Sequence, residues 1–221
     1  MAEGERTAPE ARYGLLLITL IAAYLVSAVT HSKWAAAVHV TFIVAIALLA
    51  MRHIRLRPRG VALAISVIVV TAIAAGIGVL SSNTTTQGIA AIWNGLVLLL
   101  TVTVIIDHVL RLNKVTTQSI YAALSSYLLI GLMFASFYAA IGFLASGPFF
   151  ANGQPDNAST LQYFSFTTLT TLGYGDFTAA GNFGRALAVL EALAGQVFLA
   201  TLVARLVSAY GTTRRRPPPG E

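Results

Sequence analysis

The sequence predicts an all-α integral membrane protein with six transmembrane helices and a short re-entrant segment between the fifth and the sixth. Three observations support this class. The 221 residues are 57% hydrophobic and only 10% charged, and the mean hydropathy is +0.77. Apolar runs of about 20 residues, long enough to cross a bilayer, recur along the chain. A polar, glycine-containing stretch separates the last two runs.

Six apolar segments carry the transmembrane prediction. Each is interrupted by few charges and is long enough for about 30 Å of hydrocarbon. The first is longer than the core of a signal peptide and lacks a cleavage site, so we interpret it as a retained helix. The predicted spans are 13–30, 34–51, 61–80, 89–110, 119–144 and 184–210.

The charges of the loops predict a multi-pass protein of the cell membrane with both termini cytoplasmic. The net charge of +6 is concentrated in loops on one side of the bundle, which is a topology signal and argues against nucleic-acid binding. Only Lys33 and Arg185 fall on the other side. Anionic lipid head groups are candidate partners of two basic clusters, although topology and a solvated proline-rich end explain these clusters equally well. The clusters are Arg52, Arg55, Arg57 and Arg59, and Arg214, Arg215 and Arg216.

The polar stretch at 159–177, STLQYFSFTTLTTLGYGDF, is too short and too polar to be a seventh crossing. We expect a re-entrant hairpin in which Ser159 or Thr160 caps a short helix over 161–170. Gly173 and Gly175 then end the helical conformation. Irregular backbone at membrane depth is tolerated only where it is buried in protein or lines a water-filled path. An ion pathway satisfies that condition.

Glycine alternates with bulky residues at the end of this stretch. If Gly173 and Gly175 adopt positive φ while Leu172 and Tyr174 do not, successive carbonyl groups point to the same side. Four such strands around an axis form stacked oxygen rings that can replace the hydration shell of a monovalent cation. The partially negative C-terminal end of the preceding helix favours a cation as well.

The run TTLTTLGYGD, residues 167–176, resembles the pore signature of potassium channels, in which carbonyl oxygens of a TVGYG loop coordinate K⁺. The resemblance extends more loosely through the fifth helix, the re-entrant segment and the sixth helix. It implies passive conduction of K⁺, with K⁺ as the permeant ion and no cofactor. It also implies a cytoplasmic tail at 1–12, a four-helix region resembling a voltage-sensor-like domain at 13–115, a pore domain with pore helix and selectivity filter at 116–210, and a basic tail at 211–221.

The resemblance assigns ion-binding roles to five consecutive residues. Thr171 supplies the innermost ion site through its carbonyl and hydroxyl groups. Leu172, Gly173 and Tyr174 supply carbonyl rings, so that K⁺ binds from Thr171 to Tyr174, and Gly175 completes the outer mouth. Leu172 replaces the commoner valine, and we expect its side chain to face protein behind the filter.

Three residues are implied to support the filter: Tyr163, Thr170 and Asp176. Asp176 lies behind the outer mouth in this comparison, where many relatives use a tryptophan as hydrogen-bond donor. Tyr163 stands at the tryptophan position, so its hydroxyl is the candidate replacement. Thr167 stands where some relatives carry a buried carboxylate, and that device is absent here.

Two residues of the sixth predicted helix are gating candidates. Gly195 stands where the potassium channel family often has a hinge glycine, but a small residue for close helix packing is the alternative. Glu191, one turn earlier, is an ionisable group within a predicted span and therefore a functional candidate. We consider two roles for Glu191: direct ion contact, or a structural carboxyl that is protonated and hydrogen-bonded between subunits.

The fourth predicted helix, IWNGLVLLLTVTVIIDHVLRL, has no basic residue before His108 and Arg111. Steep voltage gating requires several charges per subunit, because one charge crossing 100 mV contributes only about 2.3 kcal/mol. We therefore expect voltage-independent or weakly voltage-dependent behaviour. Asp107 and Arg111 are spaced for an ion pair within the helix.

One GYG element per chain predicts a homotetramer, because a closed oxygen ring needs four strands. A non-selective cation channel is the nearest alternative, but its relatives commonly disrupt the GYG element. A non-conducting regulatory membrane subunit is another. A membrane enzyme using Asp107, His108 or Glu191 lacks a second catalytic group, so no enzymatic activity is expected. The short predicted cytoplasmic ends leave no room for a ligand-binding domain.

Overall fold

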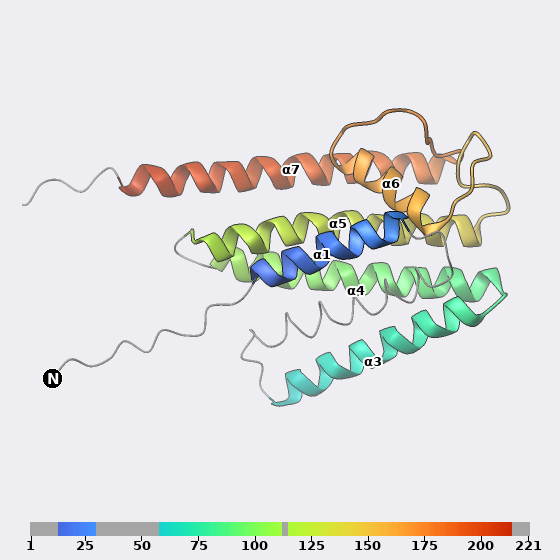
Figure 1. Cartoon of the computed structure of the whole chain (residues 1–221), viewed down its shortest axis with the longest axis horizontal. Coiled ribbons are helices and arrows are strands. Elements are labelled where there is room, and N and C mark those ends of the chain that lie inside the picture. The colour runs from blue at the N-terminus through green and yellow to red at the C-terminus, as the bar shows by residue number, and fades with distance from the viewer. Residues whose placement is uncertain (1–12, 30–57, 112–114, 214–221) are drawn as a thin grey trace, which may run out of the picture.

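The computed structural model describes residues 13–29, 58–111 and 115–213, which are helical apart from connecting loops and one isolated bridge (Figure 1). The all-helical prediction is confirmed for these residues. The second predicted span, 34–51, lies outside them, as do six of the seven predicted lipid-binding arginines: Arg52, Arg55, Arg57, Arg214, Arg215 and Arg216. The seventh, Arg59, belongs to the first turn of α3. The helices are α1 (Tyr13–Val29), α3 (Pro58–Leu80), α4 (Thr84–Arg111), α5 (Thr117–Leu144), α6 (Ala158–Leu169) and α7 (Asn182–Thr213).

Three of the described helices are long and apolar enough to cross a membrane: α4, α5 and the part of α7 from Asn182 to Ser208. Shorter apolar stretches occur at Tyr13–Ser27 and Val69–Gly78. The total of six crossings therefore stays a prediction. Two of these long helices, α5 and α7, flank α6 along the chain, and the third, α4, precedes α5.

Helix α5 forms the centre of the fold, because it packs against α1, α4, α6 and α7. A capping box fixes its start, in which Thr116 and Ser119 each bond the other's backbone amide. Along α4, glycine allows close approach: a Cβ added at Gly95 would lie 2.4 Å from the Phe137 ring. Asn94 adds an interhelical hydrogen bond of 3.0 Å to the Ser136 hydroxyl.

The two outer helices attach differently. Helix α3 lies against α4 and away from α6 (Figure 1), with a hydrogen bond of 3.0 Å from the Trp93 indole to the Thr71 hydroxyl. Helix α1 crosses α5 and also reaches α6. The rings of Tyr24 and Phe166 meet edge to face there, with centroids 4.8 Å apart. Helix α1 therefore packs directly against α6.

Helix α6 lies obliquely between α5 and α7, at the end of the bundle where the long loops gather (Figure 1). The loops on its two sides pair with each other, as the Ala151 amide bonds the Thr178 carbonyl and the Ala180 amide bonds the Phe149 carbonyl, both at 2.8 Å. A cluster of aromatic rings fills the space beneath this pairing. Its members are Tyr138, Phe149, Phe150, Phe164 and Phe177.

Candidate functional site

The start of α6 is set by Asn157. Its side-chain oxygen accepts hydrogen bonds from the amides of Ser159 and Thr160, both at 3.1 Å. The expectation that Ser159 or Thr160 caps this helix is therefore wrong. Asparagine is a strong N-cap residue, and one carbonyl oxygen here satisfies two free amides. The Thr160 hydroxyl instead donates to the Pro155 carbonyl.

The end of α6 is a Schellman motif. The Leu172 amide bonds the Thr167 carbonyl at 2.8 Å, and the Thr171 amide bonds the Thr168 carbonyl at 2.9 Å. Thr171 takes the left-handed position of the motif, with φ +57°. Glycine usually occupies this position, since a left-handed conformation costs other residues about 1–2 kcal/mol. The twelve residues of α6 are too few to cross a bilayer.

Backbone conformation alternates through the GYG element. Gly173 has φ +49° and Gly175 has φ +78°, whereas Leu172 and Tyr174 are not in the positive-φ region. The expected positive φ at both glycines is confirmed. The positive φ of Thr171 extends the alternation by one residue and was not anticipated from the sequence. The five residues from Thr171 to Gly175 are all exposed in the single chain.

The bulky side chains of this element lack cover. Leu172 is 54% and Tyr174 is 68% exposed. Leu172 was expected to face protein behind the element, but less than half of it is covered by its own chain. Large apolar side chains also line the exposed face of α7, namely Val189, Leu190, Leu193, Val197, Val203 and Val207. An exposed apolar face of this length fits lipid or another protein surface.

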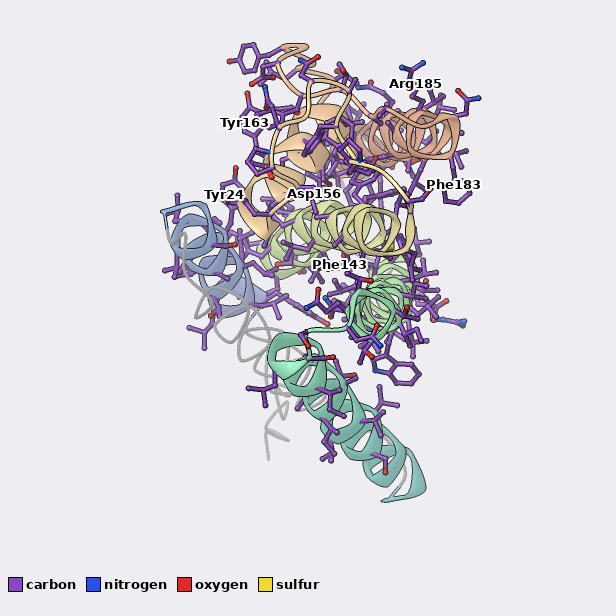
Figure 2. All side chains as sticks on the ribbon, turned by 90° about the vertical axis from the view of Figure 1, so that its right-hand side faces the viewer. Tyr24, Phe143, Asp156, Tyr163, Phe183 and Arg185 are labelled. Atoms are coloured by element: carbon purple, nitrogen blue, oxygen red, sulfur yellow. The ribbon has the colours of Figure 1, made fainter. Side chains whose placement is uncertain are left out.

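Asp176 is tied back to α6. The Tyr163 hydroxyl donates a hydrogen bond of 2.9 Å to Asp176 Oδ2, so the expected contact is present. This bond to the carboxylate raises the pKa of Tyr163. Gln154 adds a hydrogen bond of 3.2 Å to the Asp176 carbonyl. Figure 2 shows Tyr163 beside the loops at this end of the molecule, close to where Tyr24 of α1 meets α6.

Gly195 allows α7 to touch the end of α6. A Cβ added at Gly195 would lie 2.4 Å from the Leu169 carbonyl oxygen. The Tyr127 hydroxyl of α5 donates a hydrogen bond of 3.1 Å to the same oxygen. Helix α7 continues unbroken through this position. This contact supports the close-packing interpretation of Gly195.

Glu191 joins three helices. Its side chain is 0% exposed, and Oε2 accepts a hydrogen bond of 2.5 Å from the Tyr138 hydroxyl of α5. Oε1 lies 2.5 Å from the Ser165 hydroxyl oxygen of α6. Ser165 in turn lies 2.7 Å from the Gly131 carbonyl oxygen of α5. Since no solvent reaches the carboxyl, this arrangement fits the structural interpretation better than direct ion contact. Its hydrogen-bond partners, however, lie in the same chain and not in a neighbouring subunit as expected.

Sequence reasoning missed several residues of the site: Tyr127, Tyr138, Ser165 and Gln196. The Gln196 amide lies 3.3 Å from the Thr171 hydroxyl and donates to it. Thr170, expected to support the filter, is the C-cap residue of α6, and its hydroxyl bonds the Phe166 carbonyl. A polar residue within an apolar span was a usable signal for Gln196, whereas Ser165 is one of many polar residues in the stretch 159–177. The two tyrosines give no such signal, because tyrosine is common at membrane interfaces.

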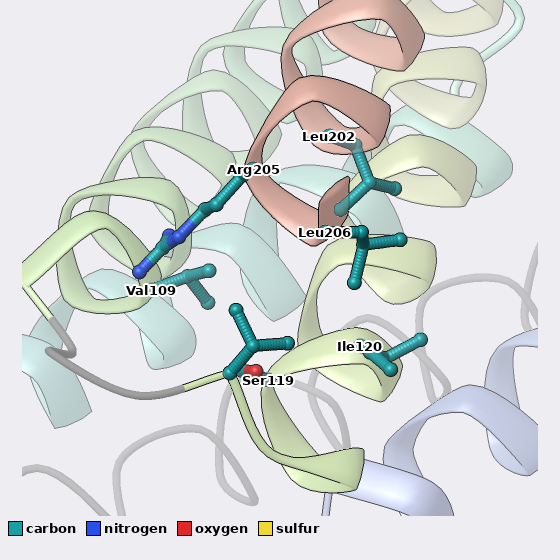
Figure 3. Close-up of a pocket in the computed structure, with 7 residues that line it drawn as sticks. Val109, Ser119, Ile120, Leu202, Arg205 and Leu206 are labelled. Carbon is teal, nitrogen blue, oxygen red and sulfur yellow. The ribbon is translucent and has the colours of Figure 1, made fainter. Parts of the chain in front are cut away.

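A small recess opens at the opposite end of α5 and α7 (Figure 3). It is bounded by Val109, Ser119, Leu202 and Arg205, which come from α4, α5 and α7. Asp107 and Arg111, near the same end of α4, form the expected ion pair at 2.8 Å on the exposed surface. Among the described residues, no three His, Cys, Asp or Glu side chains gather in a group that could hold a metal.

Replacing Tyr163 with phenylalanine tests the contact to Asp176. We expect Tyr163→Phe to speed amide hydrogen exchange in residues 176–180, because the loop loses its side-chain tether to α6. The control is Tyr121→Phe, a tyrosine near the start of α5 that packs on Gly14. Equal exchange in the two variants would contradict a tethering role for Tyr163.

Comparison with known proteins finds ion channels similar to the part of the chain that contains this site. A family model described as "Ion channel" matches residues 126–211, which include α6, the GYG element and most of α5 and α7. A stretch of 71 residues is 34% identical to the inward rectifier potassium channel Kirbac3.1 of Paramagnetospirillum magnetotacticum. That stretch is 32% of this chain and 24% of the relative, so the chain spans about a quarter of its length. No solved structure matches the chain.

These matches define a class. Together with the apolar helices, they support a membrane protein with an ion channel domain and favour a channel over an enzyme. The named relative is a potassium channel. The family match covers the C-terminal part of the chain, and α1, α3 and α4 lie outside the matched residues.

Proposed function

We propose that the chain is one subunit of a potassium-selective channel in which four copies conduct K⁺ passively through a filter formed by residues 171–175. The observation that carries this proposal is the alternating backbone at the end of α6. Positive φ at Thr171, Gly173 and Gly175, with other conformations between them, suits a strand whose carbonyl groups share one direction. Carbonyl oxygens at this spacing take the place of water around a monovalent cation.

The contacts of the proposed filter suit an ion pathway. The amide groups of Leu172 and Gly173 bond back to Thr167, within α6. No hydrogen bond from the described residues reaches the carbonyl groups of residues 171–175, so these oxygens are available to an ion. The C-terminal end of α6, with its partial negative charge, precedes the filter directly. K⁺ is then held at Thr171, Leu172, Gly173 and Tyr174, and Gly175 forms the outer mouth. No cofactor is needed for this passive conduction.

The geometry of one strand supports a ring of four chains. A single chain supplies one face of an oxygen cage and leaves Leu172, Tyr174 and the apolar face of α7 uncovered. Cyclic association of four copies closes the cage and buries these surfaces together. Native mass spectrometry of the detergent-solubilised protein should therefore give a mass of four chains.

The decisive experiment is a reversal potential. The purified chain is reconstituted in a planar bilayer with K⁺ on one side and Na⁺ on the other. A reversal near the K⁺ equilibrium potential supports the proposal, whereas a reversal near zero favours the non-selective cation channel. If no current flows, thermal unfolding in K⁺ and in Na⁺ separates a closed gate from an absent filter. A filter that binds K⁺ raises the unfolding temperature in K⁺ only, and no difference between the two ions favours the regulatory subunit.

We expect the conductance of this channel to be nearly independent of voltage. The described residues of α4 carry basic side chains only in the last turn, and Arg111 there is paired with Asp107. In symmetrical K⁺ without blocking ions, the open probability should change less than severalfold over 100 mV. A steep conductance–voltage relation would contradict this prediction and would require moving charge outside α4.

A further inference from the structure

We propose that Glu191 is a neutral, proton-carrying clasp that holds α6 against α5 and α7, and so positions the filter that α6 carries. This inference deepens the proposed function. It rests on that function only in treating residues 171–175 as a filter. The hydrogen-bond partners of Glu191 are Tyr138 and Ser165, neither of which belongs to residues 171–175, so Glu191 acts on that segment through α6. It is therefore a positioning residue.

Counting protons indicates that the carboxyl group is protonated. Three close contacts join five oxygen atoms: the Tyr138 hydroxyl, both oxygens of Glu191, the Ser165 hydroxyl and the Gly131 carbonyl. The two hydroxyl groups supply only two protons. If the carboxyl were ionised, Ser165 could donate its one proton to Glu191 or to the Gly131 carbonyl, but not to both. The other contact, 2.5 or 2.7 Å long, would then bring two oxygen lone pairs together with no proton between them.

A third proton on Glu191 completes the chain of hydrogen bonds. Oε1–H then donates to the Ser165 hydroxyl, which donates to the Gly131 carbonyl, while Oε2 accepts from Tyr138. Every oxygen in the chain then has a complementary partner. Fully satisfied buried polar networks of this kind rigidify the elements that they join.

The surroundings of Glu191 also favour the neutral form. Both of its oxygens contact hydroxyl groups, and no lysine, arginine or histidine among the described residues forms a salt bridge with it. The titratable groups of α5 that interact with Glu191 are Tyr138 and Tyr127, and the Tyr127 hydroxyl donates its hydrogen bond to the Leu169 carbonyl. On α6, the nearest such group along the chain is Tyr163, which bonds Asp176. An ionised carboxylate buried without a cation is costly, so the group keeps its proton.

The clasp acts close to the filter. Ser165 is four residues before Leu169, the last residue of α6, and Glu191 is four residues before Gly195, which packs on the Leu169 carbonyl. Helix α7 thus holds α6 at two points, one turn apart on each helix. Releasing the first point weakens the attachment of α6 to α7 one turn before the end of α6 that leads into Thr171.

Infrared difference spectroscopy tests the proton directly. The full chain is reconstituted in lipid at neutral pH, and its spectrum is compared with that of Glu191→Gln. We expect the difference to contain the carbonyl stretch of a protonated carboxyl, shifted in heavy water. Asp107→Asn, which removes an exposed, ion-paired carboxylate, should instead lose carboxylate bands. Carboxylate bands lost in Glu191→Gln would overturn the proposal.

Conduction and stability test the clasp. Glutamine is neutral, and its amide can donate to Ser165 while its carbonyl accepts from Tyr138, so Glu191→Gln should keep the K⁺ to Na⁺ permeability ratio of the wild type. Glu191→Leu removes the acceptor of the Tyr138 hydroxyl and the donor to Ser165, which keeps its bond to the Gly131 carbonyl. It should lower that ratio about tenfold, as expected for loss of one or two hydrogen bonds. Tyr138→Phe and Ser165→Ala should each lower the unfolding temperature. If Glu191→Gln behaves like Glu191→Leu, the negative charge is what matters and the clasp is wrong.

The two proposals fail separately. The infrared band and the unfolding temperatures require no current. A wild-type protein that shows the protonated carboxyl but no K⁺ selectivity refutes the channel proposal and leaves the clasp intact. A selective channel with an ionised Glu191 does the reverse.

Discussion

Gly195→Ala is expected to abolish normal assembly of the pore region. The added Cβ would lie 2.4 Å from the Leu169 carbonyl oxygen, and the obstacle is backbone at the end of α6, which cannot rotate away. Either α7 moves out or α6 shifts with the filter. Overpacking of this kind costs about 1–3 kcal/mol at each site, and the proposed tetramer would contain four sites. The unfolding temperature and the fraction of tetramer should both fall, and K⁺ selectivity should be lost in what still assembles.

Gly76→Ala is the matched control for this variant. Gly76 also lies within a helix, α3, but a Cβ there meets nothing within 4 Å. Because alanine is the better helix former by about 1 kcal/mol, Gly76→Ala should leave stability unchanged or raise it. Gly195 as a hinge makes a different prediction, in which Gly195→Ala assembles normally and changes only the open probability. A normal tetramer with altered gating would therefore contradict the packing interpretation.

Gly173→Ala is expected to remove K⁺ selectivity while leaving most of the fold intact. At φ +49° an L-residue with a side chain is strained by about 1–2 kcal/mol. No neighbouring atom within 4 Å blocks the new Cβ, so the strain is in the backbone alone. The chain relieves it by turning a peptide group, which points a carbonyl away from the ion path. The measured reversal potential between K⁺ and Na⁺ should move toward zero.

Gly153→Ala provides an unusually close control. Gly153 has φ +64°, also with nothing within 4 Å of an added Cβ, but it lies in the loop before α6. The same backbone strain should lower the unfolding temperature to a similar degree and leave selectivity unchanged. Loss of selectivity in both variants would mean that general destabilisation, and not the carbonyl direction, explains the result at Gly173.

The local features of the site were predictable because their causes are local. Positive φ at Gly173 and Gly175 follows from the absence of a Cβ. The short helix before them was predicted over 161–170 from a capping residue at its start and the glycines after its end, and it is observed at Ala158–Leu169. The N-cap at Asn157 was missed by two or three residues, although asparagine is a preferred N-cap, because Ser159 and Thr160 also fit that role. The left-handed Thr171 was missed because the Schellman motif, and not the residue type, imposes it.

The sequence by itself determined that this is a helical membrane protein and where its polar, glycine-containing segment lies. Hydropathy and glycine geometry act over a few residues, so they can be read along the chain. Only the tertiary structure decided the surroundings of Glu191 and Gly195. The partners of Glu191 lie 53 and 26 residues away, and that of Gly195 lies on another helix. A buried carboxyl and a helix glycine each have several uses, and the atoms packed against them select one.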